Sequence, residues 1–353
     1  MSARTGHLHS PSVDAAFVLG TPLVAIALGV LSLAVPPLAA FVLGFDLWFV
    51  SFPHVASTFT RIAFTREDAR RHRWLLTVLP FAAIALAFGL VRIGGLVALS
   101  TTYFFWQSFH YARQSYGIDR AYRGAAGIAS RPDPLGTALV YLVPLWGVLV
   151  RCAQGTRSFL SIAIALPRVP MVCAQIVGAM TMLVALAWTI RTARTLATDA
   201  GAAETHRALY LLTHVAVFTI GYVVVRDLTR GWIIVNIWHN AQYLAFVWMQ
   251  NRRRFDATKN SEPHGLLASI SSPGAAFRFF VVCAAISTLG YGVVHVATGQ
   301  YGARPAITLF LVAMQAVNFH HYVVDAVIWR SPSRARQAAS ERTLSWASTM
   351  NRN

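Results

Sequence analysis

Long apolar segments separated by short polar ones make up most of this chain. A helix needs about 20 apolar residues to cross a hydrocarbon core about 30 Å thick, and ten segments come close to or exceed this length. Their ranges are 15–35, 38–62, 74–92, 94–116, 135–152, 171–192, 207–226, 231–250, 275–298 and 305–329. The pattern predicts an all-α fold, a polytopic transmembrane helix bundle of about ten spans, with eight to ten as the range.

The connections between these segments are short. Even the longest polar ones, 117–134, 152–170 and 251–274, are too short for a separate domain. We therefore predict a single integral membrane domain over residues 1–353, with polar cytoplasmic tails at 1–13 and 331–353. Because the first apolar segment has the length of a span and no small-residue cleavage site follows it, we expect a retained helix rather than a signal peptide.

The composition supports a membrane protein and narrows its chemistry. Hydrophobic residues make up 56% of the chain and charged residues 12%, which is far from the average of a soluble domain. Cys152, Cys173 and Cys283 have no CxxC spacing. Their positions therefore argue against a disulfide framework and against a thiolate metal site.

The net charge of +17 has a clear distribution along the chain. If the N-terminus is cytoplasmic, most of the 30 basic residues fall on the same side, as the positive-inside rule requires. The opposite side keeps Arg92, Arg151, Arg157, Arg168, Arg226, Arg230 and Arg304. We predict cytoplasmic N- and C-termini and contact with anionic membrane lipids. No nucleic-acid motif accompanies the charge, so nucleic acid is not an expected partner.

Six of the apolar segments contain histidine. In two of them it is isolated, as His214 and His295, and a hydrogen-bonded core residue is expected there; the other four segments carry the candidate site histidines. They are SFPH ending at His54, WQSFHY at His110, NIWHNAQY at His239 and NFHHYVVD at His320 and His321. Polar side chains in hydrocarbon are costly, and such residues face the bundle interior where they bind a partner. All four helices would run in the same direction and place their imidazoles at a similar depth, so we predict one shared site.

Further polar residues lie on the same helix faces as these histidines. Helical spacing places Gln107 and Gln114 beside His110, and Asn236, Gln242 and Tyr243 beside His239. Asp325 follows His321 by four residues and His320 by five. A carboxylate near a ligating imidazole orients that imidazole and fixes its tautomer. We predict supporting roles of this kind for Asp325, Gln107, Gln114 and Asn236. Pro53 is expected to bend its helix just before His54.

The donor types indicate which metal would suit such a site. Imidazole ligands with no thiolate and little carboxylate favour iron, copper or zinc over magnesium or calcium. Open coordination positions would suit Fe(II) and dioxygen. The candidate ligands are His54, His110, His239, His320 and His321. Their number is compatible with one metal ion or with a di-iron centre, and the pattern leaves open which of the two adjacent histidines is a ligand.

At these motifs the chain resembles the Brp/Blh family, the bacterial membrane β-carotene dioxygenases that make retinal. The matching elements, in the family's order, are Pro53-His54, His110-Tyr111, His239 with Phe246-Val247-Trp248, and His320 with Asp325 before Ile328-Trp329-Arg330. The resemblance covers four short patches. It departs at Tyr243, where the family has a second histidine: His321 replaces that ligand, the site has one ligand fewer, or the chemistry differs.

The resemblance implies a bacterial inner-membrane enzyme that holds Fe(II) through histidines and uses O2 on a lipophilic substrate. The expected substrate class is carotenoid, isoprenoid or lipid-like, and it would enter laterally from the bilayer. Tyr243, Tyr111 and Gln242 are then candidates for positioning oxygen or substrate. Two other readings of the histidines stay open: a haem-binding electron-transfer protein, and a transporter or proton pathway that uses Asp46, Asp325 and the histidines.

Overall fold

The computed structural model describes residues 6–130, 132–198, 201–256, 265–301 and 303–329, so the predicted tail at 331–353 and the first residues of the predicted tail at 1–13 lie outside the described residues. In chain order the elements are α1 (Pro11–Ala15), η1 (Ala16–Gly20), α2 (Thr21–Ala34), η2 (Pro36–Leu38), α3 (Ala39–Phe45), η3 (Asp46–Ser51), α4 (Phe52–Phe59), α5 (Arg66–Arg71), α6 (Arg73–Thr77), α7 (Leu79–Ala125), α8 (Pro134–Ala153), β1 (Ser158–Phe159), β2 (Ile162–Ala163), α9 (Met171–Leu196), η4 (Gly201–Glu204), α10 (Thr205–Phe218), η5 (Thr219–Val224), α11 (Leu228–Asp256), α12 (Leu266–Ser271), α13 (Ala276–Gly299) and α14 (Ala303–Ile328).

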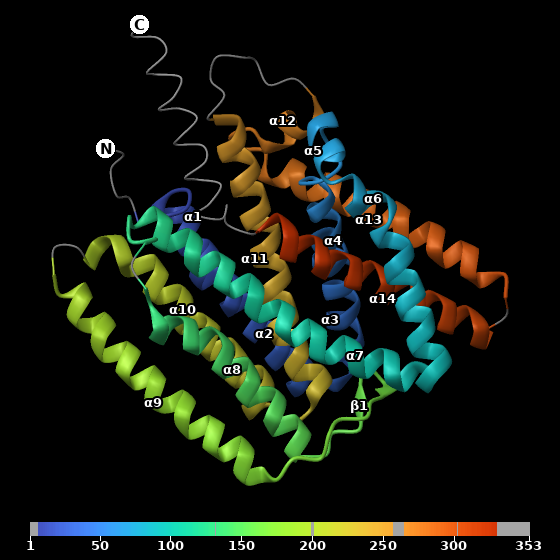
Figure 1. Ribbon diagram of the computed structural model, residues 1–353, viewed down its shortest axis with the longest axis horizontal. Coiled ribbons are helices and arrows are strands. Elements are labelled where there is room, and N and C mark those ends of the chain that lie inside the picture. The colour runs from blue at the N-terminus through green and yellow to red at the C-terminus, as the bar shows by residue number, and fades with distance from the viewer. Residues whose placement is uncertain (1–5, 131, 199–200, 257–264, 302, 330–353) are drawn as a thin grey trace, which may run out of the picture.

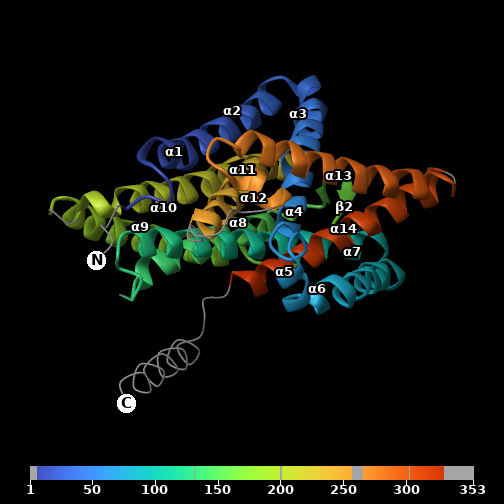
Figure 2. The ribbon, with the colours of Figure 1, turned by 90° about the horizontal axis from the view of Figure 1, so that it is seen from above.

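The predicted all-α membrane bundle is confirmed. Eight helices among the described residues are long and apolar enough to cross a membrane, and the one small sheet is the antiparallel pair of β1 and β2. Figure 2 shows α2, α3 and α13 towards one face and α7 and α14 towards the other, with α4 and α11 between them. The elements that carry the histidines therefore meet inside the bundle.

The ten predicted segments and the eight helices differ at two places. The segments 74–92 and 94–116 belong largely to α7, whose helix is interrupted at Gly94 and Gly95. Gly95 has a φ of 65°, a conformation that glycine adopts without a steric penalty. Figure 1 shows the resulting bend in α7. The segment 231–250 forms α11, which is absent from the eight because histidine, asparagine and glutamine interrupt its apolar sequence.

Helix α11 is the centre of the bundle. Every residue from 231 to 240 is buried, and α11 packs against α2, α4, η3 and η5. At Gly231 its backbone lies so close to Gly221 of η5 that a methyl group at either position would overlap the other's carbonyl oxygen. This close approach requires glycine at both positions and brings α11 against its neighbour.

We expect Gly231→Ala to destabilise the bundle by about 1–3 kcal/mol, since an added Cβ would lie 1.9 Å from the Gly221 carbonyl oxygen and α11 would have to move. Gly117→Ala is the matched control, because no atom lies within 4 Å of the added methyl group. That change should be neutral or stabilising by up to about 1 kcal/mol in a helix. Thermal denaturation in a mild detergent measures both. Equal midpoints for the two variants would contradict the role given to Gly231.

The helix is irregular just before His54, where the sequence predicts a bend. The segment 38–62 is divided into α3, the π-helical η3 and then α4, which begins one residue before Pro53. Proline cannot donate a backbone hydrogen bond and crowds the preceding turn, so a wider turn just before it relieves the clash. Short π-helical segments occur frequently at functional sites. Here the wider turn directly precedes the helix that carries His54.

Candidate metal centre

Four histidines from four helices meet at one buried point. They are His54 of α4, His110 of α7, His239 of α11 and His321 of α14, and each side chain is at most 4% exposed. One potential ligand atom from each of His54, His110 and His239 lies within 4.8 Å of the others, and the same holds for His110, His321 and Asp325. His110 belongs to both groups, so the five residues form one cluster, which we call the histidine cluster.

The closest approach within the histidine cluster is between two ring nitrogens. His54 Nε2 lies 2.8 Å from His321 Nε2, so the two rings point their nitrogen atoms at each other. Such a pair has room for one shared proton, or for two lone pairs directed at the same cation. The ring centroids of His54 and His239 are 4.9 Å apart, and those of His110 and His321 are 4.8 Å apart. The arrangement suits several imidazoles around one centre.

Three buried imidazole nitrogens in the histidine cluster have no hydrogen-bond partner among the described residues. They are His54 Nδ1, His110 Nε2 and His239 Nδ1. A buried polar atom without a partner costs free energy, and native proteins rarely leave such atoms unsatisfied. A metal ion within the cluster would engage imidazole lone pairs that protein donors leave free. The donor set and its burial therefore fit a metal ion held mainly by nitrogen.

A directed chain of hydrogen bonds starts at His321. Its Nδ1 lies 2.8 Å from Thr58 Oγ1, which lies 3.1 Å from the Tyr243 hydroxyl, and Tyr243 donates to Asp325 Oδ1. Because Asp325 accepts from Tyr243, Thr58 can donate to Tyr243 and accept from His321 Nδ1–H. This assignment leaves His321 Nε2 with a lone pair, and that nitrogen faces the histidine cluster.

Asp325 belongs to the histidine cluster, whereas Tyr243 lies beside it. Asp325 Oδ2 lies 3.7 Å from His321 Nε2 and 3.9 Å from His110 Nε2, so this oxygen can serve as a ligand as well as a supporting group. Tyr243 is fully buried, its ring lies 4.4 Å from that of His54, and Trp329 Nε1 donates to its hydroxyl at 3.3 Å. Tyr243 thus contacts the cluster through its ring, which lies beside His54, and through the hydrogen bond that it donates to Asp325.

His320 and His321, adjacent on α14, make different contacts. His320 Nε2 bonds to the Leu75 carbonyl oxygen at 2.7 Å, and its ring stacks on Phe59. His320 is therefore turned away from the histidine cluster, and its inclusion among the candidate ligands is corrected in favour of His321. Neighbouring positions on an α-helix point about 100° apart, so only one of the two can face the cluster.

The predicted supporting amide side chains form hydrogen bonds in two different parts of the bundle. Gln114 Nε2 donates to the backbone carbonyl of His239 at 2.9 Å and so ties α7 to α11. Gln107 bonds to Tyr103, Trp232 and Asn236, away from the imidazoles. Asn236 accepts from Tyr111 and donates to Asp46. Gln107 and Asn236 therefore support the neighbouring network around Asp46 rather than the histidines themselves.

The candidates for positioning oxygen or substrate are all buried. The Tyr111 ring packs at 4.1 Å against His239, and Tyr243 lies beside His54. Neither amide atom of Gln242 has a hydrogen-bond partner among the described residues. The catalytic roles of these three residues stay predictions.

Two residues of the site went unnoticed in the sequence. Thr58 lies four residues after His54, a spacing that places both on one helix face and could have revealed it. Tyr322 stacks its ring on His110 at a centroid distance of 4.3 Å. It follows His321 directly and no spacing rule connects it to His110, so only the packing of α14 against α7 brings them together.

Comparisons with known proteins add no relatives to this picture. No protein-family model, no curated protein and no solved structure matches the chain. The histidine cluster therefore has to be interpreted from its own chemistry.

We expect Tyr243→Phe to lower metal affinity by about 10–100-fold, the range found when a group supporting a ligand is removed. Without the Tyr243 hydroxyl, Thr58 can donate to His321 Nδ1, which moves the imidazole proton to Nε2 and blocks its lone pair. Metal titration of the purified apoprotein measures the effect. Tyr116→Phe is the control, because Tyr116 is on α7 beside Arg113 and outside the cluster. Unchanged affinity in Tyr243→Phe would refute the chain of hydrogen bonds.

Proposed function

We propose that this chain is an integral membrane metalloenzyme, a non-haem iron oxygenase that uses O2 on a lipophilic substrate. The observation that carries the proposal is the meeting of four imidazoles and one carboxylate in a buried cluster. Nitrogen donors with a single carboxylate suit Fe(II), with zinc and copper as the nearest alternatives. The two overlapping groups of ligand atoms are compatible with one iron or with a di-iron centre.

The residues of the histidine cluster have separable tasks in this proposal. His54, His110, His239 and His321 would hold the iron, which when bound supplies the chemistry with dioxygen. Thr58, Tyr243 and Asp325 keep the His321 tautomer that leaves Nε2 free. The Tyr111 and Tyr322 rings cover His239 and His110 and help to exclude water from the cluster.

A lipophilic substrate is favoured by where the cluster lies in the bundle. His110 is buried, whereas the preceding residue of α7, Phe109, is 57% exposed on the outer surface. One helix thickness therefore separates the cluster from the surface that would face lipid. A carotenoid, another isoprenoid or a lipid-like molecule dissolved in the bilayer could approach along this side. Membership of the Brp/Blh family, as the motifs suggest, is part of the same proposal.

The charge distribution along the chain supports one orientation of the bundle. We propose cytoplasmic termini and a bacterial inner-membrane location, because basic residues concentrate in the segments on the side of the N-terminus. The histidine-bearing helices then run towards the cytoplasm.

Haem is a poor fit to this arrangement. Two histidines that ligate one haem lie on opposite sides of a porphyrin. The 2.8 Å between His54 Nε2 and His321 Nε2 leaves no space for the macrocycle. Electron transfer through haem is therefore the weaker alternative.

A proton pathway is the second candidate, favoured by one specific network. Tyr111 donates to Asn236 Oδ1 at 2.5 Å, and Asn236 Nδ2 donates to Asp46 Oδ2 at 2.6 Å. Since the Tyr111 ring packs on His239, polar groups continue from the histidine cluster to a buried carboxylate. Such chains relay protons in membrane transporters. This candidate requires no metal, which separates it from the oxygenase.

Metal analysis with optical spectroscopy of the purified protein tests the proposed function. We expect stoichiometric iron without a haem Soret band. Oxygen uptake should depend on both the iron and a polyene or other unsaturated lipophilic substrate. Protein that stays metal-free after anaerobic incubation with Fe(II) would refute the oxygenase, and a proton flux in vesicles from that metal-free protein would favour the pathway instead.

A further inference from the structure

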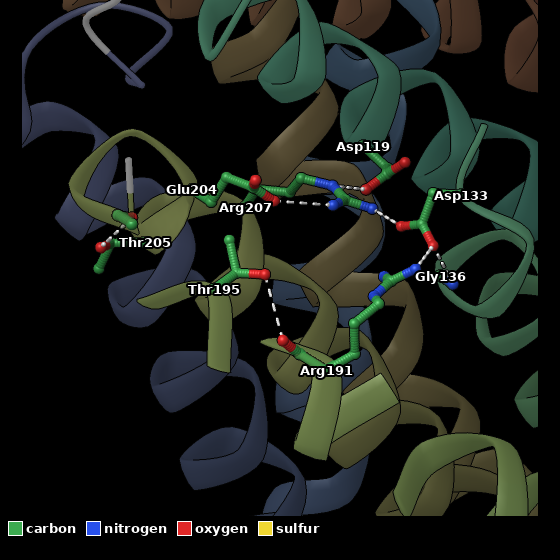
Figure 3. A network of polar contacts seen from close by, with 9 residues as sticks. Asp119, Asp133, Gly136, Arg191, Thr195, Glu204, Thr205 and Arg207 are labelled. Carbon is green, nitrogen blue, oxygen red and sulfur yellow. Dashed lines mark hydrogen bonds and ion pairs between the residues drawn. The ribbon is translucent and has the colours of Figure 1, made fainter. Parts of the chain in front are cut away.

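A second buried polar cluster lies at the end of the bundle where α7, α8, α9 and α10 come together. Arg207 of α10 is 5% exposed and donates through Nε to Asp119 Oδ1 at 2.7 Å. Its other nitrogens bond to Asp133 and Glu204. Arg191 of α9 approaches Asp133 Oδ1 at 2.7 Å, as Figure 3 shows. Three acids are thus engaged by two arginines.

Arg123, near the end of α7, remains outside this pairing. Its side chain is 5% exposed, its Nε has no hydrogen-bond partner, and no ion pair of its guanidinium is found in the described part of the chain. Asp119 lies one helical turn away, but its Oδ1 atom is bonded to Arg207 and its Oδ2 atom has no hydrogen-bond partner, so the carboxylate makes no hydrogen bond to Arg123. A buried guanidinium without a hydrogen-bonded anion is costly. Arg123 therefore has unused capacity to bind one.

Arg123 lines a cavity that can accept an anion. The cavity holds about 110 Å³, and Arg191, Arg207 and Thr192 also line it. The carboxylates of Asp133 and Glu204 line it as well, but each is paired with an arginine. It adjoins a larger hollow of about 590 Å³, with which it shares Arg191, and Arg194 and Ile190 line that hollow. Arginine side chains recognise phosphate through several parallel hydrogen bonds. The small cavity has the size and the donors for a phosphate group.

The larger hollow continues onto the apolar outer face of α9. Met180, Leu183, Leu186 and Ile190 lie at helical spacing and are 44–67% exposed. Helix α9 is one of the eight helices able to cross a membrane, so this stripe would lie against acyl chains. A basic cavity at the end of a lipid-facing stripe matches the layout of a phospholipid, with a charged head and apolar tails.

We propose that the cavity at Arg123 binds the phosphate group of an anionic phospholipid whose acyl chains lie along α9. Arg123 contacts the phosphate, Arg191 and Arg194 line its entrance, and the Asp133–Arg207 pair holds the surrounding helices in place. The proposed lipid site is separate from the histidine cluster. The proposal of a lipid site therefore does not depend on the proposed oxygenase function.

Lipid titration of the purified protein in a neutral detergent tests this site. Phosphatidylglycerol is the probe and phosphatidylcholine is the zwitterionic comparison, with the thermal midpoint and native mass spectrometry as readouts. We expect saturable stabilisation by phosphatidylglycerol alone. Arg123→Gln should weaken its apparent affinity by about tenfold or more, the effect of losing a charge-assisted contact. Arg194→Gln should weaken it less, because Arg194 is exposed.

Arg168→Gln is the matched control, since it removes the same charge from an exposed position in the connection before α9. Should Arg123→Gln fail to fold, Arg123→Lys keeps the charge, and together with Arg194→Gln it still measures the contribution of the site. Equal lipid dependence in all variants would overturn the proposal, and so would equal stabilisation by the two lipids. Stabilisation of the same size by inorganic phosphate or glycerol 3-phosphate would overturn the lipid as the source of the anion.

Discussion

Replacing His321 with glutamine should abolish metal binding, whereas the same change at His320 should leave it intact. His321 Nε2 lies 2.8 Å from His54 Nε2 inside the histidine cluster, while His320 Nε2 is bonded to the Leu75 carbonyl oxygen. The two variants change the same residue type at adjacent positions of one buried helix. A difference in metal binding between the two variants therefore shows which face of α14 provides the metal ligand.

Metal content and metal-dependent stability measure this difference. A ligand that binds only the folded state stabilises it in proportion to the logarithm of its concentration over Kd, so added Fe(II) should raise the thermal midpoint of the wild type and of His320→Gln. His321→Gln should show no such rise and should retain no iron above background, a greater loss than the roughly 10–100-fold fall in affinity expected for a merely supporting residue. Iron retained by His321→Gln and lost by His320→Gln would reverse the assignment.

Replacing Arg207 with glutamine should destabilise the bundle by about 3–5 kcal/mol, the cost of breaking a buried ion pair by removing one partner. The variant leaves Asp119 and Asp133 buried. Asp119 loses its hydrogen-bonded arginine, and Asp133 keeps Arg191 and the Gly136 amide as partners. Arg113→Gln is the control: Arg113 is exposed and donates to the Tyr141 hydroxyl, so its loss should change stability by no more than about 0.5 kcal/mol. Unfolding free energies in mixed detergent micelles measure both, and similar values would contradict the structural role of Arg207.

From the hydrogen bonds of Asp133 with Arg191 and Arg207, we predict that the protein loses stability in acid. Burial raises the pKa of Asp133, but hydrogen bonds from Arg191, the Gly136 amide and Arg207 outweigh it and hold the pKa below its usual range. A carboxyl whose pKa is lowered by folding stabilises the protein fully above its unfolded pKa, about 3.9, and loses this contribution as the pH falls towards the folded value. The thermal midpoint of the wild type should fall below about pH 4. Asp133→Asn should remove this part of the pH dependence.

The helices and the depth of the histidines could be predicted from the sequence because both depend on local properties. Segment length and apolarity decide which residues can cross a bilayer, and the boundary predicted between the segments 74–92 and 94–116 lies next to the break of α7 at Gly94 and Gly95. Helical spacing also connected Gln114 to the site and Asp325 to His321. Spacing along one helix is preserved whatever the helix packs against.

The placement of single side chains depended on how each helix is rotated about its axis. Gln107 and Asn236 share helix faces with His110 and His239 by spacing, yet they bond within the network that includes Asp46. The expected span 231–250 became the buried centre of the bundle because Gly231 and Gly221 bring their backbones together. No local pattern encodes such contacts between residues far apart in the chain.

The sequence by itself determined that this is a helical membrane protein with histidines at a common depth, since hydrophobicity and the helical repeat act residue by residue. Only the tertiary structure decided that His321 rather than His320 completes the cluster and that Tyr243 lies beside it, bonded to Thr58 and Asp325. The reason is geometric. Adjacent residues on a helix diverge by about 100°, and the packing of α14 against α4 and α7 selects which of them faces inward.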